Sequence, residues 1–339
     1  MRLVALVESP EHVCCRYRVA ALRPHLEAAG YSLDLRPWPR RWWSRLRIGR
    51  AVRDADVVIL QRRLLPTWLL YLLRCSVRRL IFDFDDAVFL RDSYSPKGLH
   101  SARRLHRFVA TVETADAIVA GNPYLAEEAT RWAAKPDRVH VVPTCVETAR
   151  YLPARHEGTG TELVWVGSAS TLRGLEAVRP LLEDIGRSIP GTRLKLVSDH
   201  FLHLDHLPIV ECPWSEEREA ADIAAADIGI SWVPDDLWSR GKCGLKVLQY
   251  MAAGLPVVAN PVGVHTDLVK HGETGFLAHT AAEWIEALRR LSADPDLRRR
   301  MGAAGRWRVE TEFSVAAGAA RWLTLLRGLR RPTSDKDAA

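Results

Sequence analysis

The chain has 339 residues, of which 47% are hydrophobic and 26% charged. This length exceeds that of a chain with one ordinary hydrophobic core and predicts two domains of about 150 residues each. The composition is typical of a folded protein and excludes a disordered chain. The net charge is +7, and the basic residues concentrate in residues 1–110. This basic front end predicts an anionic partner: a membrane surface, a phosphorylated acceptor or nucleic acid.

Other broad classes are disfavoured by local patterns. The six cysteines are scattered without a CxxC spacing, which predicts reduced thiols and neither disulfides nor a zinc site. The opening "MRLVALVESPEH" reads as a short strand and not as a secretion signal. No run of 18 uncharged apolar residues occurs, so we expect no transmembrane helix and a cytoplasmic protein.

In the first half, strands and helices alternate, which predicts a parallel sheet covered on both faces. "RYRVAALRPHLEAAGY" has helical spacing and a glycine stop. The expected strands are 2–8, 54–62, 78–87, 116–122 and 138–144.

The pattern restarts after a polar, turn-rich segment at 151–161, the predicted linker. Expected strands are 162–168, 193–199, 207–213, 227–234 and 255–261, and expected helices are about 172–187, 216–226, 243–253 and 314–330. We therefore predict an α/β protein of two Rossmann-like, doubly wound domains facing a central cleft. The predicted boundaries are 1–152 and 162–313, and the helix 314–330, with Ser314 as its N-cap, is expected to cross back to the first domain.

The segment "RGKCGLKVLQYMAAGLPVVA" (240–259) carries polar groups in an otherwise apolar stretch. With a helix starting near Cys243, Lys242, Lys246 and Gln249 share one face. Gly241 and Gly244 bracket the helix start, where free N–H groups and the helix dipole favour an anion. We predict a phosphate there, clamped by the two lysines; the alternative is that both lysines are merely solvated.

The segment "GKCGLKVLQYMAAGLPVVANPVGVHTDLVKHGETGFLA" resembles the donor-binding half of retaining glycosyltransferases of family 4 (glycosyl transferases group 1), which have the GT-B fold. "FDFDDAVF", "DAIVAGNPYLAEEA", "VVPTCVE", "VWVGSAST", "ADIGISWVPDD" and "FSVAAGAARWL" match in order. The resemblance implies sugar transfer from a nucleotide diphosphate donor, with retained anomeric configuration and no metal or other cofactor.

The chain departs from the Glu-x7-Glu pattern that many members carry. The second Glu falls on Gln249, which can still hydrogen-bond a ribose, and the first falls on Gly241. The identity of the donor sugar is therefore left open, and so is the possibility that the chain is an inactive copy of the family. Lys242 and Lys246 favour activity, because they can neutralise a departing diphosphate.

The resemblance also implies further donor-binding residues. Gly167 and Ser168 lie where the family closes its backbone around the diphosphate, and Arg173 adds a cation. Trp214 could stack on the base, and Asp267 falls where relatives place a Glu next to the sugar; ordinary turn and core roles are the alternatives. The remaining donor-binding candidates are Gly244 and Leu245, at the helix start.

Two stretches of the first domain border the expected cleft. "DFDDA" suggests a metal site of another glycosyltransferase fold, but carboxylates alone indicate a metal weakly, and we assign no metal. Asp85 and Asp86 are predicted to contact acceptor hydroxyls and to help take a proton, with a structural cap as the alternative. Arg16 and Arg18 follow the first strand and are predicted to reach a phosphate, with solvation at the surface as the alternative.

"RPWPRRWWSRLRIGR" (36–50) interleaves tryptophans with arginines, and the apolar "LLPTWLLYLLRCSVRR" follows. This pattern suits an interfacial membrane segment or a single-strand nucleic-acid binder; a packed helix with a basic outer face is the third possibility. We favour an anionic membrane surface, contacted by Arg41, Trp42, Trp43 and Arg45, and expect no nucleic acid.

The sequence thus predicts a hexosyltransferase that moves a sugar from a UDP- or GDP-sugar to a glycan or lipid-linked acceptor in cell-surface polysaccharide synthesis. It would lie peripherally at the inner face of the plasma membrane. The alternatives are a GT-B nucleotide-sugar epimerase and a non-catalytic basic module that binds membrane or nucleic acid.

Overall fold

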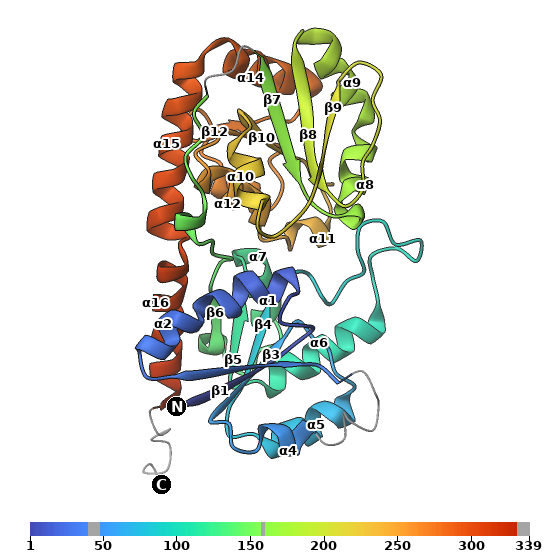
Figure 1. Ribbon diagram of the computed structural model, residues 1–339. Coiled ribbons are helices and arrows are strands. Elements are labelled where there is room, and N and C mark those ends of the chain that lie inside the picture. Colours follow the sequence, from blue (N-terminus) through green and yellow to red (C-terminus); the bar gives the residue numbers. More distant parts are fainter. Residues whose placement is uncertain (40–47, 157–159, 331–339) are drawn as a thin grey trace. The chain divides into compact units, whose positions relative to one another are not determined.

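The computed structural model describes residues 1–39, 48–156 and 160–330. These residues form two compact units, each with its own parallel sheet (Figure 1). The N-terminal unit comprises Met1–Cys145, Gly241–Cys243 and the chain from Val315 onward, and the C-terminal unit comprises Val146–Arg240 and Gly244–Ser314. The predicted α/β class with two doubly wound sheets is confirmed.

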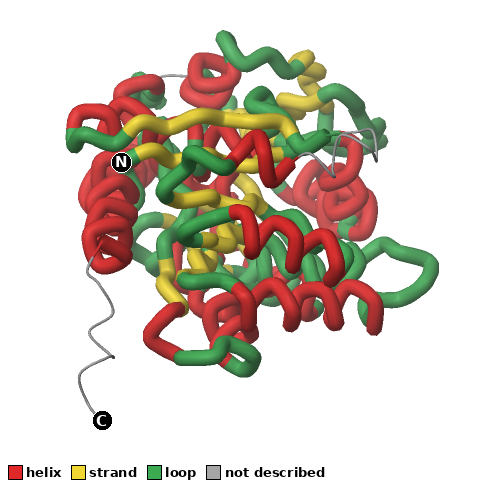
Figure 2. The backbone as a smooth tube through the Cα atoms, turned by 90° about the horizontal axis from the view of Figure 1, so that it is seen from below, coloured by secondary structure: helices red, strands yellow, loops and turns green. Residues whose placement is uncertain are grey.

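The sheet of the N-terminal unit has the strand order β2-β1-β3-β4-β5-β6, and all its pairs are parallel. Helices lie on both sides of the strands (Figure 2). The strands are β1 (Arg2–Val7), β2 (Ser32–Pro37), β3 (Val57–Gln61), β4 (Leu80–Phe84), β5 (Ala117–Ala120) and β6 (Val139–Val141). The helices are α1 (Val13–Arg18), η1 (Ala20–Leu22), α2 (Arg23–Ala28), α4 (Ile48–Val52), α5 (Thr67–Ser76), α6 (Ala102–Thr114), α7 (Pro123–Thr130), η2 (Pro136–Arg138) and α16 (Val315–Arg330).

The sheet of the C-terminal unit has the order β12-β11-β10-β7-β8-β9, again with parallel pairs. Its strands are β7 (Thr161–Val166), β8 (Thr192–Ser198), β9 (Ile209–Pro213), β10 (Ile228–Ser231), β11 (Val257–Ala259) and β12 (Gly275–Leu277). Its helices are η3 (Thr148–Arg150), α8 (Ala169–Ala177), α9 (Arg179–Ser188), α10 (Glu219–Ala224), α11 (Leu237–Arg240), α12 (Leu245–Ala252), α13 (His265–Leu268), α14 (Ala281–Ala293) and α15 (Pro295–Glu312).

Helix α16 belongs to the hydrophobic core of the N-terminal unit, although it ends the described chain. Val315, Trp322 and Leu326 are almost fully buried among side chains of β1 and α2. The helix runs beside α2 in Figure 1, in agreement with the contacts between them. The apolar face of α16 is therefore covered by elements from the other end of the sequence.

The boundary between the units lies at Cys145 and Val146, a few residues before the expected position near 152. Tyr151 shows why the intervening residues group with the C-terminal unit. Its hydroxyl accepts a hydrogen bond from Gln249 at 3.2 Å, and its carbonyl accepts one from Arg306 at 2.6 Å. Both partners are residues of that unit.

Candidate functional site

In the C-terminal unit, β7 and β10 are neighbours in the sheet but not in the chain. The connections after these two strands run to opposite sides, which leaves a crevice outside their carboxyl ends where open α/β sheets bind ligands. The residues that follow β7 are Gly167 and Ser168. The structure therefore places this pair at the edge of the sheet that suits a ligand.

The turn after β7 needs a glycine. A Cβ atom on Gly167 would lie 2.5 Å from both the Trp165 ring and Thr171 Oγ1. Ser168 precedes α8, and its N–H donates to Thr171 Oγ1 at 3.1 Å. The N–H of Ala169, in the first turn of α8, donates a hydrogen bond to the carboxylate of Asp199 at 2.8 Å. Arg173 lies exposed on α8.

Helix α12 begins at Leu245, two residues later than the sequence suggested. Gly244 is its N-cap with φ 66°, a left-handed conformation that glycine adopts at no cost. A side chain there would also meet Leu268 at 2.4 Å. The first N–H groups of a helix have no acceptor inside it, so the start of α12 is a suitable position for an anion.

Lys246 lies in the first turn of α12, with its ammonium 4.1 Å from the centre of the Trp165 ring. The ring is almost fully buried at the end of β7. A cation over an indole face is held without losing its charge. Lys246, Trp165 and Gly167 are therefore brought together at the carboxyl end of β7.

A buried histidine, which the sequence analysis did not select, lies close to this group. The two ring nitrogens of His265 bond Ser231 Oγ at 3.0 Å and the carbonyl oxygen of Asn260 at 2.9 Å. Burial lowers the pKa of His265 to about 4; the hydrogen bond to Asn260 opposes this and the charge of Lys246 adds to it. The imidazole is therefore neutral at pH 7.

The other predicted donor-side residues are spread over this unit. Gln249 is buried, and its Nε2 donates to the Tyr151 hydroxyl at 3.2 Å. Trp214 follows β9 and is 43% exposed, and its indole N–H donates to Glu219 at 2.8 Å. Asp267 is exposed on α13. Their roles in donor binding stay predictions.

In the N-terminal unit, Asp85 and Asp86 follow β4 and are held by a cation that the sequence analysis missed. Arg62, directly after β3, lies 3.1 Å from a carboxylate oxygen of Asp85 and 2.5 Å from one of Asp86. The other oxygen of Asp86 lies 3.4 Å from the Lys242 ammonium. Lys242 thus pairs with an acid of the N-terminal unit, whereas Lys246 lies in the C-terminal unit.

The side chain of Arg18 is fully committed inside the N-terminal unit. It donates to both carboxylate oxygens of Asp83, at 3.3 and 2.5 Å, and to the Val142 carbonyl at 2.7 Å. Burial raises the pKa of Asp83, and the Arg18 guanidinium opposes this by favouring the carboxylate. Arg16 is half-buried, with its guanidinium 5.5 Å from the Tyr17 ring. Phosphate binding by Arg16 and Arg18 stays a prediction.

The structure explains the departure from Glu at position 241. Gly241 packs against Ala87, and a Cβ atom on it would lie 2.7 Å from the Ala87 backbone nitrogen. Nearby, Asn122 donates to the Lys242 carbonyl at 2.9 Å and Cys243 Sγ lies 3.3 Å from the Asp85 carbonyl. The segment 241–243 therefore fits against the end of β4 only without a side chain at its first position.

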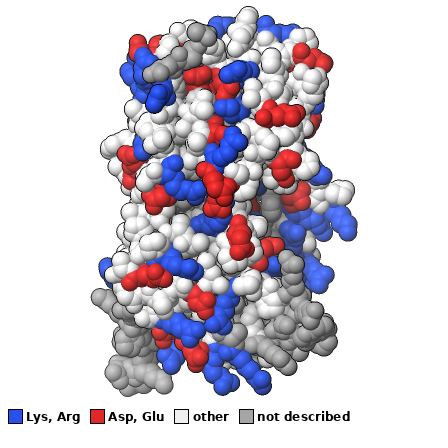
Figure 3. All heavy atoms as spheres, viewed as in Figure 1, with Lys and Arg blue, Asp and Glu red and all other residues white. Residues whose placement is uncertain are grey.

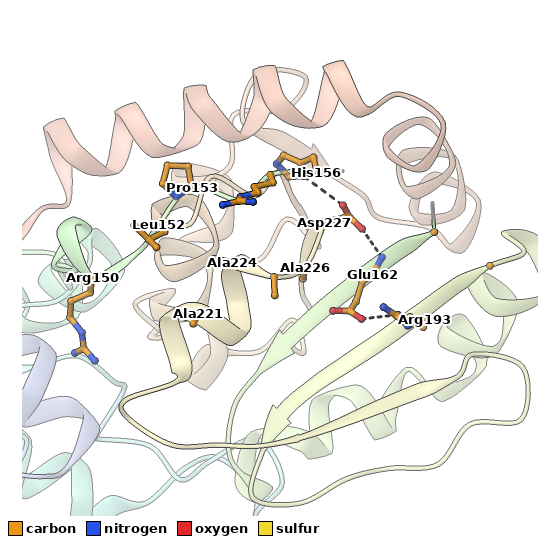
Figure 4. A pocket seen from close by; sticks show the side chains of 14 residues that line it. Arg150, Leu152, Pro153, His156, Glu162, Arg193, Ala221, Ala224, Ala226 and Asp227 are labelled. Carbon is orange, nitrogen blue, oxygen red and sulfur yellow. Dashed lines mark hydrogen bonds and ion pairs between the residues drawn. The ribbon is translucent and has the colours of Figure 1, made fainter. Parts of the chain in front are cut away.

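The described residues also contain a pocket of about 690 Å³ in the C-terminal unit (Figure 4). Its lining includes Glu162 in β7, Gly191 before β8 and Asp227 before β10. Glu162 pairs with Arg193 at 2.7 Å, and Asp227 accepts the Glu162 N–H at 2.9 Å. The pocket thus lies at the amino ends of the strands, away from Gly167 and Lys246, and its acids already have partners.

The residues expected to contact a membrane lie outside the part of the chain that the structure describes, and neither a metal site nor a membrane-spanning helix was found within that part. Arg41, Trp42, Trp43 and Arg45 lie outside the described residues. Within residues 1–39, 48–156 and 160–330, no group of three or more His, Cys, Asp or Glu side chains is arranged to hold a metal ion. No helix in these ranges combines the length and the apolar character needed to cross a membrane.

Residues 237–308, which include Lys242, Lys246 and Gln249, match the family model described as glycosyl transferases group 1. The resemblance drawn from "GKCGLKVLQYMAAGLPVVA" is thereby confirmed.

Curated relatives of this chain are named as glycosyltransferases or sugar-phosphate synthases. The alpha-maltose-1-phosphate synthase of Mycolicibacterium smegmatis is 30% identical over 64% of this chain and 64% of its own length. The D-inositol 3-phosphate glycosyltransferase of Pseudarthrobacter chlorophenolicus is 30% identical over 55% of this chain and 49% of its own. The chain therefore spans about half to two thirds of the length of the relatives it matches.

Solved structures match nearly the whole chain in fold. A sucrose-phosphate synthase from Thermosynechococcus elongatus aligns with a TM-score of 0.73 at 19% identity, covering 97% of this chain and 98% of that one. Anabaena HepE, in complex with UDP and glucose, aligns with a TM-score of 0.69 at 15% identity, covering 97% and 100%. The predicted GT-B fold, with two Rossmann-like units in one chain, is confirmed.

We expect that restoring the family glutamate at position 241 harms the protein. Overpacking a close contact costs about 1–3 kcal/mol, so Gly241→Ala and Gly241→Glu should both lower the thermal unfolding midpoint, the latter at least as much. Differential scanning fluorimetry measures the midpoints. A Gly241→Glu protein that is as stable as the wild type would contradict this packing.

We expect His265 to make folding sensitive to acid. Its pKa of about 4 in the folded chain lies below the usual value of 6.5, so the unfolded chain binds the proton more tightly. Stability is then lost as the pH falls from about 6.5 to about 4, by up to about 3 kcal/mol. Urea unfolding between pH 7 and pH 4.5 measures this loss. The variant His265→Gln keeps a donor and an acceptor and should show a smaller one; equal losses would refute the assignment.

Proposed function

We propose that the protein is a retaining, metal-independent glycosyltransferase that moves a sugar from a UDP- or GDP-sugar to a glycan or lipid-linked acceptor. The observation that carries this proposal is the position of Lys246 within the group 1 segment. It lies in the first turn of α12, beside the turn after β7. A fixed cation and free helix N–H groups stabilise the charge that develops on a departing diphosphate.

The comparisons support a sugar nucleotide as co-substrate. HepE was solved with UDP and with UDP-glucose, and the curated relatives are named for sugar phosphates or for an inositol phosphate. The proposed acceptor is correspondingly a polar molecule that carries phosphate, as a lipid-linked glycan does. A nucleotide-sugar epimerase of the same fold would convert the donor without any acceptor.

A second part of the proposal is that the N-terminal unit works at an anionic membrane surface, at the inner face of the plasma membrane, in cell-surface polysaccharide synthesis. Helix α5 supports it, because it is apolar all round: Leu69, Leu70 and Leu73 face the core, whereas Trp68 and Tyr71 are 56% and 69% exposed. A helix of this kind has a second apolar partner.

The neighbouring helix α6 carries arginines. Thr67 of α5 contacts His106 of α6, so the two helices are adjacent. Neither Arg103 nor Arg107 of α6 forms an ion pair with a described residue, and partial burial, followed by the charge of Arg103, lowers the pKa of Arg107. Figure 3 shows Lys and Arg side chains gathered over the segment that leads into α6. Aromatic rings beside unpaired arginines fit the interface of anionic lipids.

The donor assignment is tested by thermal unfolding with UDP, GDP, ADP and CMP, each without and with EDTA. A nucleotide at 100 times its dissociation constant stabilises by about 2.7 kcal/mol, so we expect an EDTA-resistant shift with UDP or GDP. In Lys246→Ala, turnover should fall about 10²-fold or more, while Lys270→Ala, at an exposed lysine of the same unit, should behave as wild type. No shift with any nucleotide would refute the proposed function.

The membrane assignment is tested by co-sedimentation with phosphatidylglycerol and phosphatidylcholine vesicles. Changing Trp68 and Tyr71 to Ala should weaken binding to the anionic vesicles about tenfold or more, because each ring that enters the interface contributes on the order of 1–2 kcal/mol. Trp307→Ala removes a ring that is 65% exposed in the C-terminal unit and should change nothing. Unchanged sedimentation of the double variant, or stronger binding to a single-stranded oligonucleotide, would overturn the assignment.

A further inference from the structure

Arg62 occupies the ligand-binding position of the N-terminal sheet. In the order β2-β1-β3-β4, the strands β1 and β3 are neighbours from which the chain proceeds to opposite sides. Such a point leaves a crevice outside the carboxyl ends of the two strands. Arg62 is the first residue after β3, and Cys14 of α1, after β1, contacts its guanidinium. The arginine therefore lies where a sheet of this topology contacts ligands.

The backbone of Arg62 is strained. Its φ is 57°, and among the described residues only His156 also combines a side chain with a positive φ. The Cβ atom makes this conformation unfavourable, and such strain persists where the surroundings over-determine it and concentrates at functional sites. Here the Arg62 N–H donates to the Asp83 carbonyl at 2.7 Å, and the side chain is held at its far end by two acids.

The guanidinium separates two neighbouring carboxylates. Asp85 and Asp86 have side chains only 11% and 14% exposed, so their mutual repulsion is poorly screened by water. One nitrogen of Arg62 lies beside each of them: one donates a hydrogen bond to Asp86, and the other forms an ion pair with Asp85 at 3.1 Å. The other charged or titratable groups around them are Cys14, Lys242, Cys243 and the Arg18–Asp83 pair.

A purely structural ion pair does not explain this arrangement. Arg18 and Asp83 already form such a pair one residue inside the strand end, with side chains 1% and 0% exposed. The side chain of Arg62 is 25% exposed and reaches outward from the end of β3. Its strained backbone places the cation between the two acids rather than inside the core.

We propose that Arg62 is a positioning residue that orients the carboxylates of Asp85 and Asp86 toward the acceptor. This inference rests on the proposed transfer reaction, in which these carboxylates contact acceptor hydroxyls and help to take a proton. Arg62 acts through them.

The experiment compares four variants of the full chain: Arg62→Gly, Arg62→Ala, Arg62→Lys and the control Arg63→Ala. Arg63 follows directly, is 37% exposed and pairs with Glu8. Gly and Ala both remove the cation, but only Gly also relieves the backbone strain. We expect Arg62→Gly to have the higher unfolding midpoint of the two, while both lose acceptor-dependent turnover about 10²-fold, because oriented groups lose this much when displaced.

Turnover is measured as UDP release from UDP-glucose with glucose 1-phosphate and inositol 3-phosphate as acceptor probes. Arg62→Lys should be intermediate, Arg63→Ala unchanged, and the stabilisation by UDP the same in all variants. Wild-type turnover in Arg62→Gly would overturn the inference, as would turnover that follows the unfolding midpoints.

A second readout does not depend on turnover. The variants without the guanidinium hold two neighbouring carboxylates with Lys242 beside Asp86 as the remaining cation, and protonation relieves the repulsion between them. The midpoint deficit of Arg62→Gly against wild type should therefore shrink between pH 7 and pH 5, and a constant deficit would refute the role of Arg62. If no nucleotide stabilises the wild type, the proposed function fails, and this readout still decides the inference.

Discussion

The parallel pairing of the strands is the constraint on which the rest of this structure depends. In a parallel sheet all carboxyl ends meet at one edge, so residues far apart in sequence become neighbours there. β7 and β10 are paired in this way in the C-terminal unit, and Arg62 and Asp85 lie 3.1 Å apart in the N-terminal unit. The amino ends, where Glu162 and Asp227 line the pocket, have structural ion pairs instead.

The cations discussed here contact different groups in the two units. In the N-terminal unit, Arg18, Arg62 and Lys242 are each paired with an aspartate. In the C-terminal unit, Lys246 lies over an indole ring, which holds a cation without neutralising it. The paired cations of the N-terminal unit are better suited to orienting acids than to binding a diphosphate.

Close approaches of the backbone determine which side chains are allowed around these residues. Gly167 leaves room for the Trp165 ring that supports Lys246, and Gly241 leaves room for Ala87 beside Asp86. The glycine that stands at position 241 in place of the family glutamate is therefore required by the packing of this chain. Arg62 is the opposite case, since a side chain is kept at a backbone conformation that favours glycine. A residue of this kind is retained for its charged group.

The sequence by itself determined the alternation of strands and helices, the two parallel sheets and the group 1 segment, because apolar runs and glycine stops are local signals. It also indicated Asp85, Asp86, Lys242 and Lys246 by residue type. Tertiary structure decided the rest. No neighbouring residue in the sequence indicates the positive φ of Arg62 or its contacts with two aspartates, because both depend on the packing of β3 against β4. His265 reads as a surface histidine until burial makes it neutral, and only the αL turn at Gly244 separates Lys242 from the helix that holds Lys246.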